Sequence, residues 1–159
     1  MKKFSLVIIL VSFFWGFSQK APKDFPITNT ATEAFALQQE TQKPIVFFFF
    51  TDWCKYCFAM KKNTFTHKET IALLNENFHF VLFNAESKET ITLKDTHFKN
   101  KNGTHELAIA LASKNGYINY PSLVILNKNN TIDEQISTFL PAKKLNKLLN
   151  KYLTKKSDN

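Results

Sequence analysis

Continuous apolar runs are the clearest pattern along this chain. A strand buried on both faces forms such a run, whereas a half-buried strand alternates between apolar and polar residues. Residues 45–50 and 78–83 are almost unbroken apolar segments, which predicts two central strands. Residues 123–126 predict a further strand. After a turn at 127–130, the alternation over 131–137 predicts a strand with Ile132 and Ile136 on one face.

Helical patterns fill the segments between these strands. A threonine before the first helix is a typical cap, and proline is favoured at the first helical position. The final helix is expected to be amphipathic, with four leucines at helical spacing: Leu145, Leu148, Leu149 and Leu153. The helices expected are one after Thr30 or Thr32, one over 54–63 that continues or restarts after Thr66, one over 106–113, and one starting at Pro141.

A polar insertion interrupts this order at residues 87–104. Within it, 90–93 and 96–98 are expected to pair as a hairpin across Lys94-Asp95. Residues 99–103 are expected to form a loop. The resulting order of helix, strand, helix, strand, insertion, helix, strand, strand and helix predicts one α/β domain.

The N-terminus has the pattern of an export signal. Lys2 and Lys3 precede an apolar stretch over 4–17 that is short for a membrane span, and Gly16-Phe17-Ser18 has the small residues of a cleavage site. We expect a signal peptide at 1–18, a lead-in at 19–30, a domain at 31–153 and a polar tail at 154–159. This predicts an extracytoplasmic and most simply periplasmic protein without stable membrane insertion after cleavage; secretion and an uncleaved N-terminal anchor are the alternatives.

Cys54 and Cys57 are the only cysteines of the chain. They follow the first apolar run and precede a predicted helix, where the helix dipole favours the thiolate of the first cysteine. Their spacing closes too small a loop to act as an effective structural staple. Two thiols are also too few for a tetrahedral metal site, and Phe58 stands where haem attachment needs histidine. The pair therefore predicts dithiol–disulfide exchange, without a metal.

The formal charge of +8 comes from lysine alone, since the chain has no arginine. Specific phosphate or base recognition relies on arginine forks, so nucleic acid is not an expected partner. The excess is interpreted as a solvated surface with a bias toward acidic partners. The lysine-rich C-terminal helix is interpreted as solvated, with binding to a membrane surface as the alternative.

The motif Trp53-Cys54-x-x-Cys57 after the first strong strand, with Tyr120-Pro121 before the next-to-last strand, resembles the thioredoxin superfamily. More narrowly, it resembles exported bacterial thioredoxin-like proteins related to the C-terminal domain of DsbD-type thiol:disulfide interchange proteins. The resemblance covers about 31–153. It implies a thioredoxin fold, in which helices flank a central mixed sheet, with the small polar insertion added around 87–104.

The resemblance also implies roles for individual residues. Cys54 is the exposed nucleophile and Cys57 the more buried resolving thiol, and their disulfide is the redox centre, with no other cofactor. Pro121 is a cis-proline beside the disulfide. In the family the backbone before this proline pairs with a substrate chain, so Trp53, Tyr120 and Pro121 are the expected substrate-binding residues. Trp53 is expected to shield the disulfide, and Tyr120 either contacts substrate or packs in the core.

One position departs from the family pattern. Many thioredoxins carry a buried acid that accepts a proton from the resolving cysteine, but the family spacing places Phe48 there. Glu86, after the second strong strand, is the alternative acceptor that we select, and water is another. Lys55, Lys61 and Lys62 add positive charge that favours the Cys54 thiolate.

The predicted function is therefore an enzyme, a thiol–disulfide oxidoreductase that acts on protein disulfides or dithiols. Reduction is the favoured direction, which would require a membrane protein as electron donor. The alternative is a non-catalytic binding module of the same fold, in which Cys54–Cys57 is a structural disulfide.

Overall fold

The computed structural model of the protein describes residues 24–93 and 95–157. The expected signal peptide at 1–18 and the first part of the expected lead-in lie outside the described residues. Within the described residues, no helix is both long enough and apolar enough to cross a membrane.

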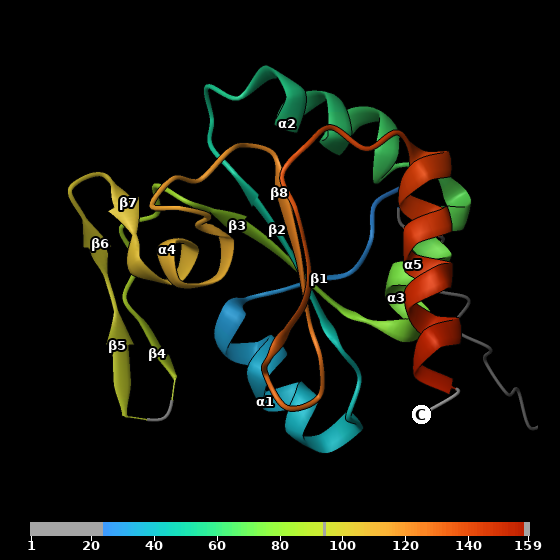
Figure 1. Ribbon diagram of the computed structural model, residues 1–159, viewed down its shortest axis with the longest axis horizontal. Helices are drawn as coiled ribbons and strands as arrows, with labels where there is room; N and C mark the ends of the chain where they lie inside the picture. Colours follow the sequence, from blue (N-terminus) through green and yellow to red (C-terminus); the bar gives the residue numbers. More distant parts are fainter. Residues whose placement is uncertain (1–23, 94, 158–159) are drawn as a thin grey trace, which may run out of the picture.

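A five-stranded mixed sheet forms the centre of the domain, in the order β1-β3-β2-β8-β9 (Figure 1). β1, β3 and β2 run parallel, whereas β8 is antiparallel to β2 and β9 is antiparallel to β8. The expected α/β thioredoxin fold with a central mixed sheet is therefore confirmed. The strands are β1 (Thr28–Asn29), β2 (Ile45–Phe50), β3 (His79–Asn84), β8 (Ser122–Leu126) and β9 (Ile132–Ile136).

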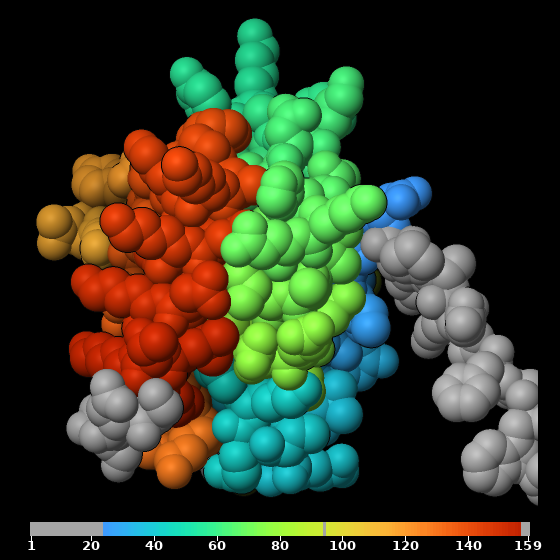
Figure 2. All heavy atoms as spheres, turned by 90° about the vertical axis from the view of Figure 1, so that its right-hand side faces the viewer, coloured from blue at the N-terminus to red at the C-terminus, as the bar shows by residue number. Residues whose placement is uncertain are grey.

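Helices cover both faces of this sheet. Two of them, α1 and α4, pack against one face, and α3 and α5 cover the other (Figures 1 and 2). The helical segments are α1 (Ala31–Thr41), α2 (Lys55–Ala59), the π-helical turn η1 (Met60–Thr64), α3 (Lys68–Asn77), α4 (Glu106–Ala112) and α5 (Ala142–Ser157). The helix that starts after Cys54 thus ends in a π turn, and a new helix begins at Lys68, which is one of the two outcomes expected.

Local sequence signals explain where α1 begins. Thr30, and not Thr32, is its N-cap, and the Thr30 hydroxyl oxygen accepts a hydrogen bond from the backbone N–H of Glu33. The Glu33 carboxylate in turn accepts from the backbone N–H of Thr30 at 2.8 Å, which completes a capping box. The Thr30 backbone N–H and the Thr30 hydroxyl both donate to the Glu33 carboxylate, and they lower the pKa of Glu33 because they stabilise its charged form.

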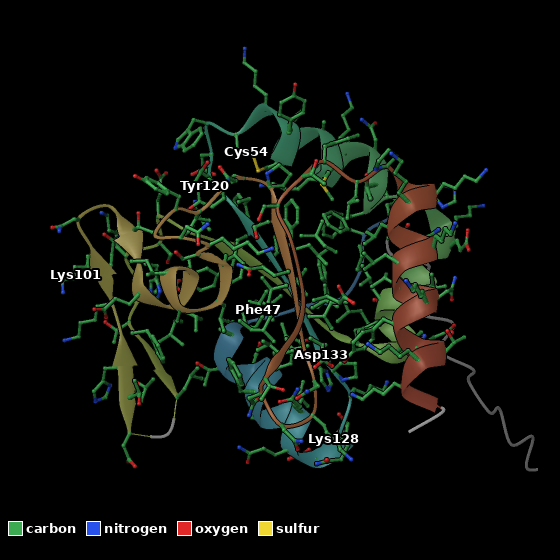
Figure 3. All side chains as sticks on the ribbon, in the orientation of Figure 1. Phe47, Cys54, Lys101, Tyr120, Lys128 and Asp133 are labelled. Atoms are coloured by element: carbon green, nitrogen blue, oxygen red, sulfur yellow. A yellow bond between two sulfur atoms is a disulfide. The ribbon has the colours of Figure 1, made fainter. Side chains whose placement is uncertain are left out.

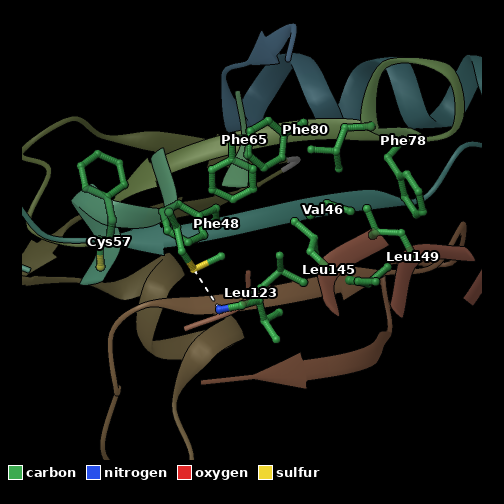
Figure 4. Packing of buried hydrophobic residues seen from close by; sticks show 14 of the residues in the cluster. Val46, Phe48, Cys57, Phe65, Phe78, Phe80, Leu123, Leu145 and Leu149 are labelled. Atoms are coloured by element: carbon green, nitrogen blue, oxygen red, sulfur yellow. Dashed lines mark hydrogen bonds between the residues drawn. The ribbon is translucent and has the colours of Figure 1, made fainter. Parts of the chain in front are cut away.

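β2 is buried along its whole length, as the apolar run predicts. Because side chains alternate across a strand, Val46, Phe48 and Phe50 pack on the side of α3 and α5 (Figure 4). Ile45, Phe47 and Phe49 belong to the second cluster, on the side of α1 and α4. Full burial of each such phenylalanine contributes about 1.5–3 kcal/mol, so this strand connects two substantial cores.

The polar insertion is more ordered than the sequence analysis predicted. The hairpin is confirmed as β4 (Ile91–Leu93) paired with β5 (Thr96–Phe98). The expected loop at 99–103 is wrong, because β6 (Asn100–Lys101) and β7 (Thr104–His105) form a second hairpin. Asn102 and Gly103 both have positive φ, the backbone conformation that a two-residue Asn-Gly hairpin turn requires.

Two expectations near the C-terminus are corrected. Ile132 is 43% exposed while Ile136 packs against the core, because a register irregularity beside Ile125 and Leu126 breaks the alternation of β9. α5 begins one residue after Pro141 and continues to Ser157, so the expected polar tail is helical in its first part.

Candidate active site

Cys54 and Cys57 form a disulfide at the start of α2, with an S–S distance of 2.03 Å. Cys54 is the N-cap residue of α2, and its sulfur accepts a hydrogen bond from the backbone N–H of Cys57 at 3.1 Å. α2 continues directly into η1, so the sulfur lies at the N-terminal end of a helical segment that runs to Thr64. Both the backbone donor and the helix dipole would stabilise a Cys54 thiolate in the reduced protein.

The two cysteines differ in exposure, but less than expected. Cys57 is fully buried, whereas Cys54 is 6% exposed. Cys54 is therefore the more accessible of the two cysteines, as expected. The expectation that Cys54 is exposed is too strong for the oxidised protein, because the residue is almost completely covered. Both residues belong to the core cluster under α2, which explains the low exposure of Cys54.

The Tyr120–Pro121 peptide bond is cis, as the resemblance implies. Pro121 is buried directly before β8, and Tyr120 lies at the same end of the molecule as Cys54 (Figure 3). The Tyr120 ring contacts the Trp53 ring edge-on, with 5.9 Å between ring centroids. Tyr120 also packs against both core clusters, so at least the packing role is observed. Burial and the nearby Glu86 charge raise the pKa of Tyr120.

Glu86 contacts Trp53 in the structure. The Trp53 indole N–H donates a hydrogen bond of 2.9 Å to the Glu86 carboxylate. Among the hydrogen bonds of the described residues, none joins Glu86 to either cysteine. The structure therefore gives Glu86 a contact with Trp53, and the role of Glu86 as proton acceptor for Cys57 stays a prediction.

Polar side chains that the sequence analysis missed extend this contact. Asn84 donates from its amide to the Asp52 carboxylate at 3.0 Å, and its amide oxygen accepts from the backbone N–H of Glu86 at 2.9 Å. The ends of β2 and β3 thus connect through Asp52, Asn84, Glu86 and Trp53. One sequence feature could have predicted these contacts: polar residues follow two parallel strands, and the carboxyl ends of such strands lie at one edge of a sheet.

The floor of the site is apolar. Phe48 is fully buried and packs edge-on against Phe65, with 4.8 Å between ring centroids. Among the described residues, no Asp or Glu is buried. The hydroxyl oxygen of Thr51, the residue directly after β2, is buried and has no hydrogen-bond partner in the described part of the chain. The absence of an acid at position 48 therefore leaves a site without a buried carboxylate.

The three lysines near the site differ in their surroundings. Lys61 lies over the Phe50 ring, with its Nζ 3.4 Å from the centroid. Burial lowers the pKa of Lys61, and the nearby Asp52 charge opposes this effect. Lys55 and Lys62 are exposed, so solvent weakens their effect on the cysteines.

Three aromatic residues around the disulfide are strongly exposed. Trp53, Tyr56 and Phe58 are 66%, 67% and 65% exposed. Tyr56 also lies 6.2 Å from Phe139, measured between ring centroids. A role in binding was not predicted for Tyr56 or Phe58 from the sequence. Exposed aromatic side chains are enriched at sites that bind other proteins.

The described residues contain no group of three or more histidine, cysteine, aspartate or glutamate side chains that could hold a metal ion. A C-x-x-C disulfide at a helix start, with a cis-proline before an antiparallel strand of a mixed sheet, defines a thioredoxin-like protein. The family model for the thioredoxin-like domain matches residues 31–153, and the chain belongs to this family.

Solved structures share this fold. A thioredoxin from Thermus thermophilus superposes with a TM-score of 0.61 at 18% identity, covering 82% of this chain and 89% of that chain. DsbH oxidoreductase gives 0.58 at 19% identity, covering 79% and 83%. The oxidised C-terminal domain of DsbD from Neisseria meningitidis gives 0.53 at 18% identity, covering 79% and 98%.

At these identities the similarity shows a shared fold. A search of curated protein sequences finds no match to this chain. The family and the Cys54–Cys57 disulfide together support thiol–disulfide oxidoreductase chemistry in general.

Proposed function

We propose that this protein is an exported thiol–disulfide oxidoreductase that exchanges electrons with protein disulfides and dithiols, and that it acts as a reductase. The observation that carries the proposal is the Cys54–Cys57 disulfide at the start of α2, where the Cys57 N–H bonds to the Cys54 sulfur at 3.1 Å. The donor stabilises a thiolate at Cys54 specifically, which is the form that attacks a disulfide.

In the reductive direction the reduced protein carries two thiols. The Cys54 thiolate attacks one sulfur of a substrate disulfide, which forms a mixed disulfide and releases the first substrate thiol. Cys57 then loses its proton and attacks the Cys54 sulfur, which releases the second substrate thiol and forms Cys54–Cys57. Two electrons pass to the substrate, and a reduced dithiol partner, in our proposal a membrane protein, must restore the two thiols.

Proton transfer from Cys57 needs a group other than a buried carboxylate, because Phe48 occupies the expected position of the acid. We propose that water accepts this proton once Cys54 has opened toward the substrate. Desolvation disfavours thiolate formation at the fully buried Cys57, so this step is expected to limit the reaction.

The exposed aromatic residues support a polypeptide as the substrate. Trp53, Tyr56 and Phe58 each offer a large apolar surface beside a sulfur atom that is itself nearly covered. Aromatic residues are favoured at protein–protein interfaces, where they bury much area at low entropic cost. The N-terminal sequence pattern supports export, and disulfides persist outside the cytoplasm.

Two variants test the activity. Cys54→Ser is expected to abolish reduction of insulin disulfides, because no attacking thiolate remains. Cys57→Ser should instead accumulate a mixed disulfide at Cys54, visible as a mass adduct that a reductant removes. Full insulin reduction by the Cys54→Ser protein would contradict the proposal.

The direction of transfer and the alternative of a structural disulfide need a second measurement. Alkylation of thiols in intact cells, followed by mass analysis, reports whether Cys54 and Cys57 are reduced or oxidised in their compartment. A mostly reduced pair supports a reductase. A mostly oxidised pair with a potential of about −120 to −270 mV supports an oxidase, whereas a poise far below about −300 mV supports a structural bond.

A further inference from the structure

The net positive charge of the protein comes from two segments. Residues 24–141 contain eleven lysines and twelve acidic residues, so this part of the chain is close to neutral. The remaining positive charge comes from four lysines within residues 1–23 and six within α5. α5 contains no acidic residue, which makes it the one described helix or strand with a large net charge.

Four lysines of α5, here called the α5 stripe, lie on its solvent-facing side: Lys143, Lys144, Lys147 and Lys151. Lys143, Lys147 and Lys151 are separated by four residues, so they follow one another along the same side of the helix. The opposite side, with Leu145 and Leu149, is fully buried in the core. α5 stands beside α3 on one face of the molecule (Figure 2).

The requirements of the helix itself do not explain this stripe. Like charges four residues apart destabilise a helix. Lys143 and Lys144 also lie in the first turn, where the helix dipole favours negative charge, and this turn has no acidic residue. Lysine is a good helix former, but neutral glutamine is nearly as good and would avoid both repulsions. The positive charge therefore points to a role outside the fold.

Few charges on neighbouring elements offset the stripe. Glu134 of β9 borders a hollow with Lys144, Lys147 and Lys151, and Glu69 of α3 borders another with Lys143 and Lys147. Within residues 24–93 and 95–157, none of the four stripe lysines forms an ion pair. The stripe thus retains a positive field toward solvent.

We propose that the α5 stripe docks the protein on an anionic phospholipid surface. The stripe lysines extend over about two turns of a straight helix, which suits a flat array of negative charges. Their ammonium groups are hydrated point charges and lack the fork that arginine uses for specific phosphate or base contacts. Because Leu145 and Leu149 belong to the core, the helix stays outside the lipid and binding is electrostatic.

This orientation leaves the disulfide accessible. Figure 3 places Cys54 beside α2 at one end of the molecule, away from the outer face of α5, and Lys101 of the insertion on the opposite side. A protein docked through the stripe would keep the end of the molecule that carries Cys54 and the exposed Trp53 away from the lipid. The docking does not depend on disulfide chemistry, so it can be tested separately from the proposed activity.

Two matched triple variants of the full chain provide the test. Lys143→Gln/Lys147→Gln/Lys151→Gln removes three charges from the stripe, and Lys88→Gln/Lys99→Gln/Lys101→Gln removes the same number from the insertion. Both variants keep residues 1–23, so any lipid contact of that segment is common to them. Co-sedimentation compares phosphatidylcholine vesicles with and without phosphatidylglycerol, at low and at high salt.

The stripe variant should lose most of the extra binding that phosphatidylglycerol provides. Each lysine near an anionic surface contributes about fivefold, so three predict a roughly hundredfold weaker anionic component, and high salt should abolish it in the wild type. The insertion variant should bind anionic vesicles like the wild type. Equal losses in the two variants would overturn the proposal.

If residues 1–23 alone held the chain on every vesicle, co-sedimentation would not distinguish the variants. Lysine acetylation followed by mass spectrometry then reports which lysines the vesicle protects. Stripe lysines should be protected on anionic vesicles only, whereas Lys88, Lys99 and Lys101 should react equally on both vesicle types. Unchanged reactivity of the stripe lysines on anionic vesicles would refute docking. Stronger protection by a DNA duplex than by anionic vesicles would replace the lipid assignment.

Discussion

The contact between Glu86 and Trp53 allows two roles of Glu86 to be separated by substitution. The Trp53 indole N–H donates to the Glu86 carboxylate at 2.9 Å, and Trp53 in turn contacts Tyr120. If Glu86 positions Trp53, the oxygen acceptor matters and the ability to take up a proton does not. Glu86→Gln retains an amide oxygen that can accept the indole hydrogen bond, whereas Glu86→Ala removes the acceptor.

The structure sets the size of the expected effect. A hydrogen bond to a charged group contributes about 1.5–3 kcal/mol when it is protected from water. Trp53 is 66% exposed, so water replaces part of the lost contact and about 1 kcal/mol remains. In a rate this corresponds to about a fivefold loss for Glu86→Ala, and to less than about a twofold loss for Glu86→Gln.

The assay compares two substrates. Turnover of insulin disulfides depends on how the protein substrate meets Trp53, whereas a small aromatic disulfide mainly reports the reactivity of Cys54. Glu86→Ala should slow insulin reduction and leave the reaction with the small disulfide unchanged. Glu86→Gln should resemble the wild type with both substrates, across the pH range in which the wild type is active.

The opposite pattern would refute this reasoning. If Glu86 accepted the proton of Cys57, Glu86→Gln would be as slow as Glu86→Ala, and the loss would extend to every disulfide substrate. A changed pH profile in Glu86→Gln would support the same conclusion. Either result would mean that the site rearranges during the reaction so that Glu86 approaches Cys57.

Two further substitutions test the packing around the sheet. Thr51→Val replaces a buried hydroxyl that has no partner among the described residues, so it should raise the free energy of unfolding of the oxidised protein by about 1 kcal/mol. Urea unfolding measures this change. A loss of stability would show that the hydroxyl has an unseen partner. Tyr152→Phe removes a hydrogen bond of 2.8 Å to Asp133 and should cost about 1 kcal/mol at neutral pH. Burial raises the pKa of Tyr152, and the hydrogen bond to Asp133 adds to this effect. The wild type should therefore lose stability as the pH rises above about 10, and the variant should lose less. The same dependence of unfolding free energy on pH above about 10 in both proteins would contradict this.

The apolar runs explain why most of the sheet could be predicted. Ile45–Phe50 is apolar at every position because both of its faces are covered, and such a pattern admits few alternatives. The second hairpin of the insertion was missed, although Asn102-Gly103 is a strong turn signal. Its strands are two residues long, too short for any alternation to be visible. The exposure of Ile132 follows from an irregular register that no side-chain pattern encodes.

Site residues that belong to a short sequence motif could be predicted. Contacts between residues far apart in the sequence could not. Cys54, Cys57 and the cis bond before Pro121 follow from short motifs with a family precedent. The partner of Glu86 depends on how the end of β3 meets the loop after β2, and residues 33 positions apart in sequence give no sign of it. Nor does a helix pattern show that Phe58 faces solvent beside the disulfide.

The alternation of side chains along β2 separates two kinds of change to this protein. Phe48 and Phe50 share a core with both cysteines, so a substitution there alters stability and redox chemistry together. Phe47 and Phe49 pack in the other core, with the sheet itself between them and the disulfide. Substitutions at Phe47 and Phe49 can therefore change the stability of the protein, while the reduction potential of Cys54–Cys57 depends on Phe48 and Phe50.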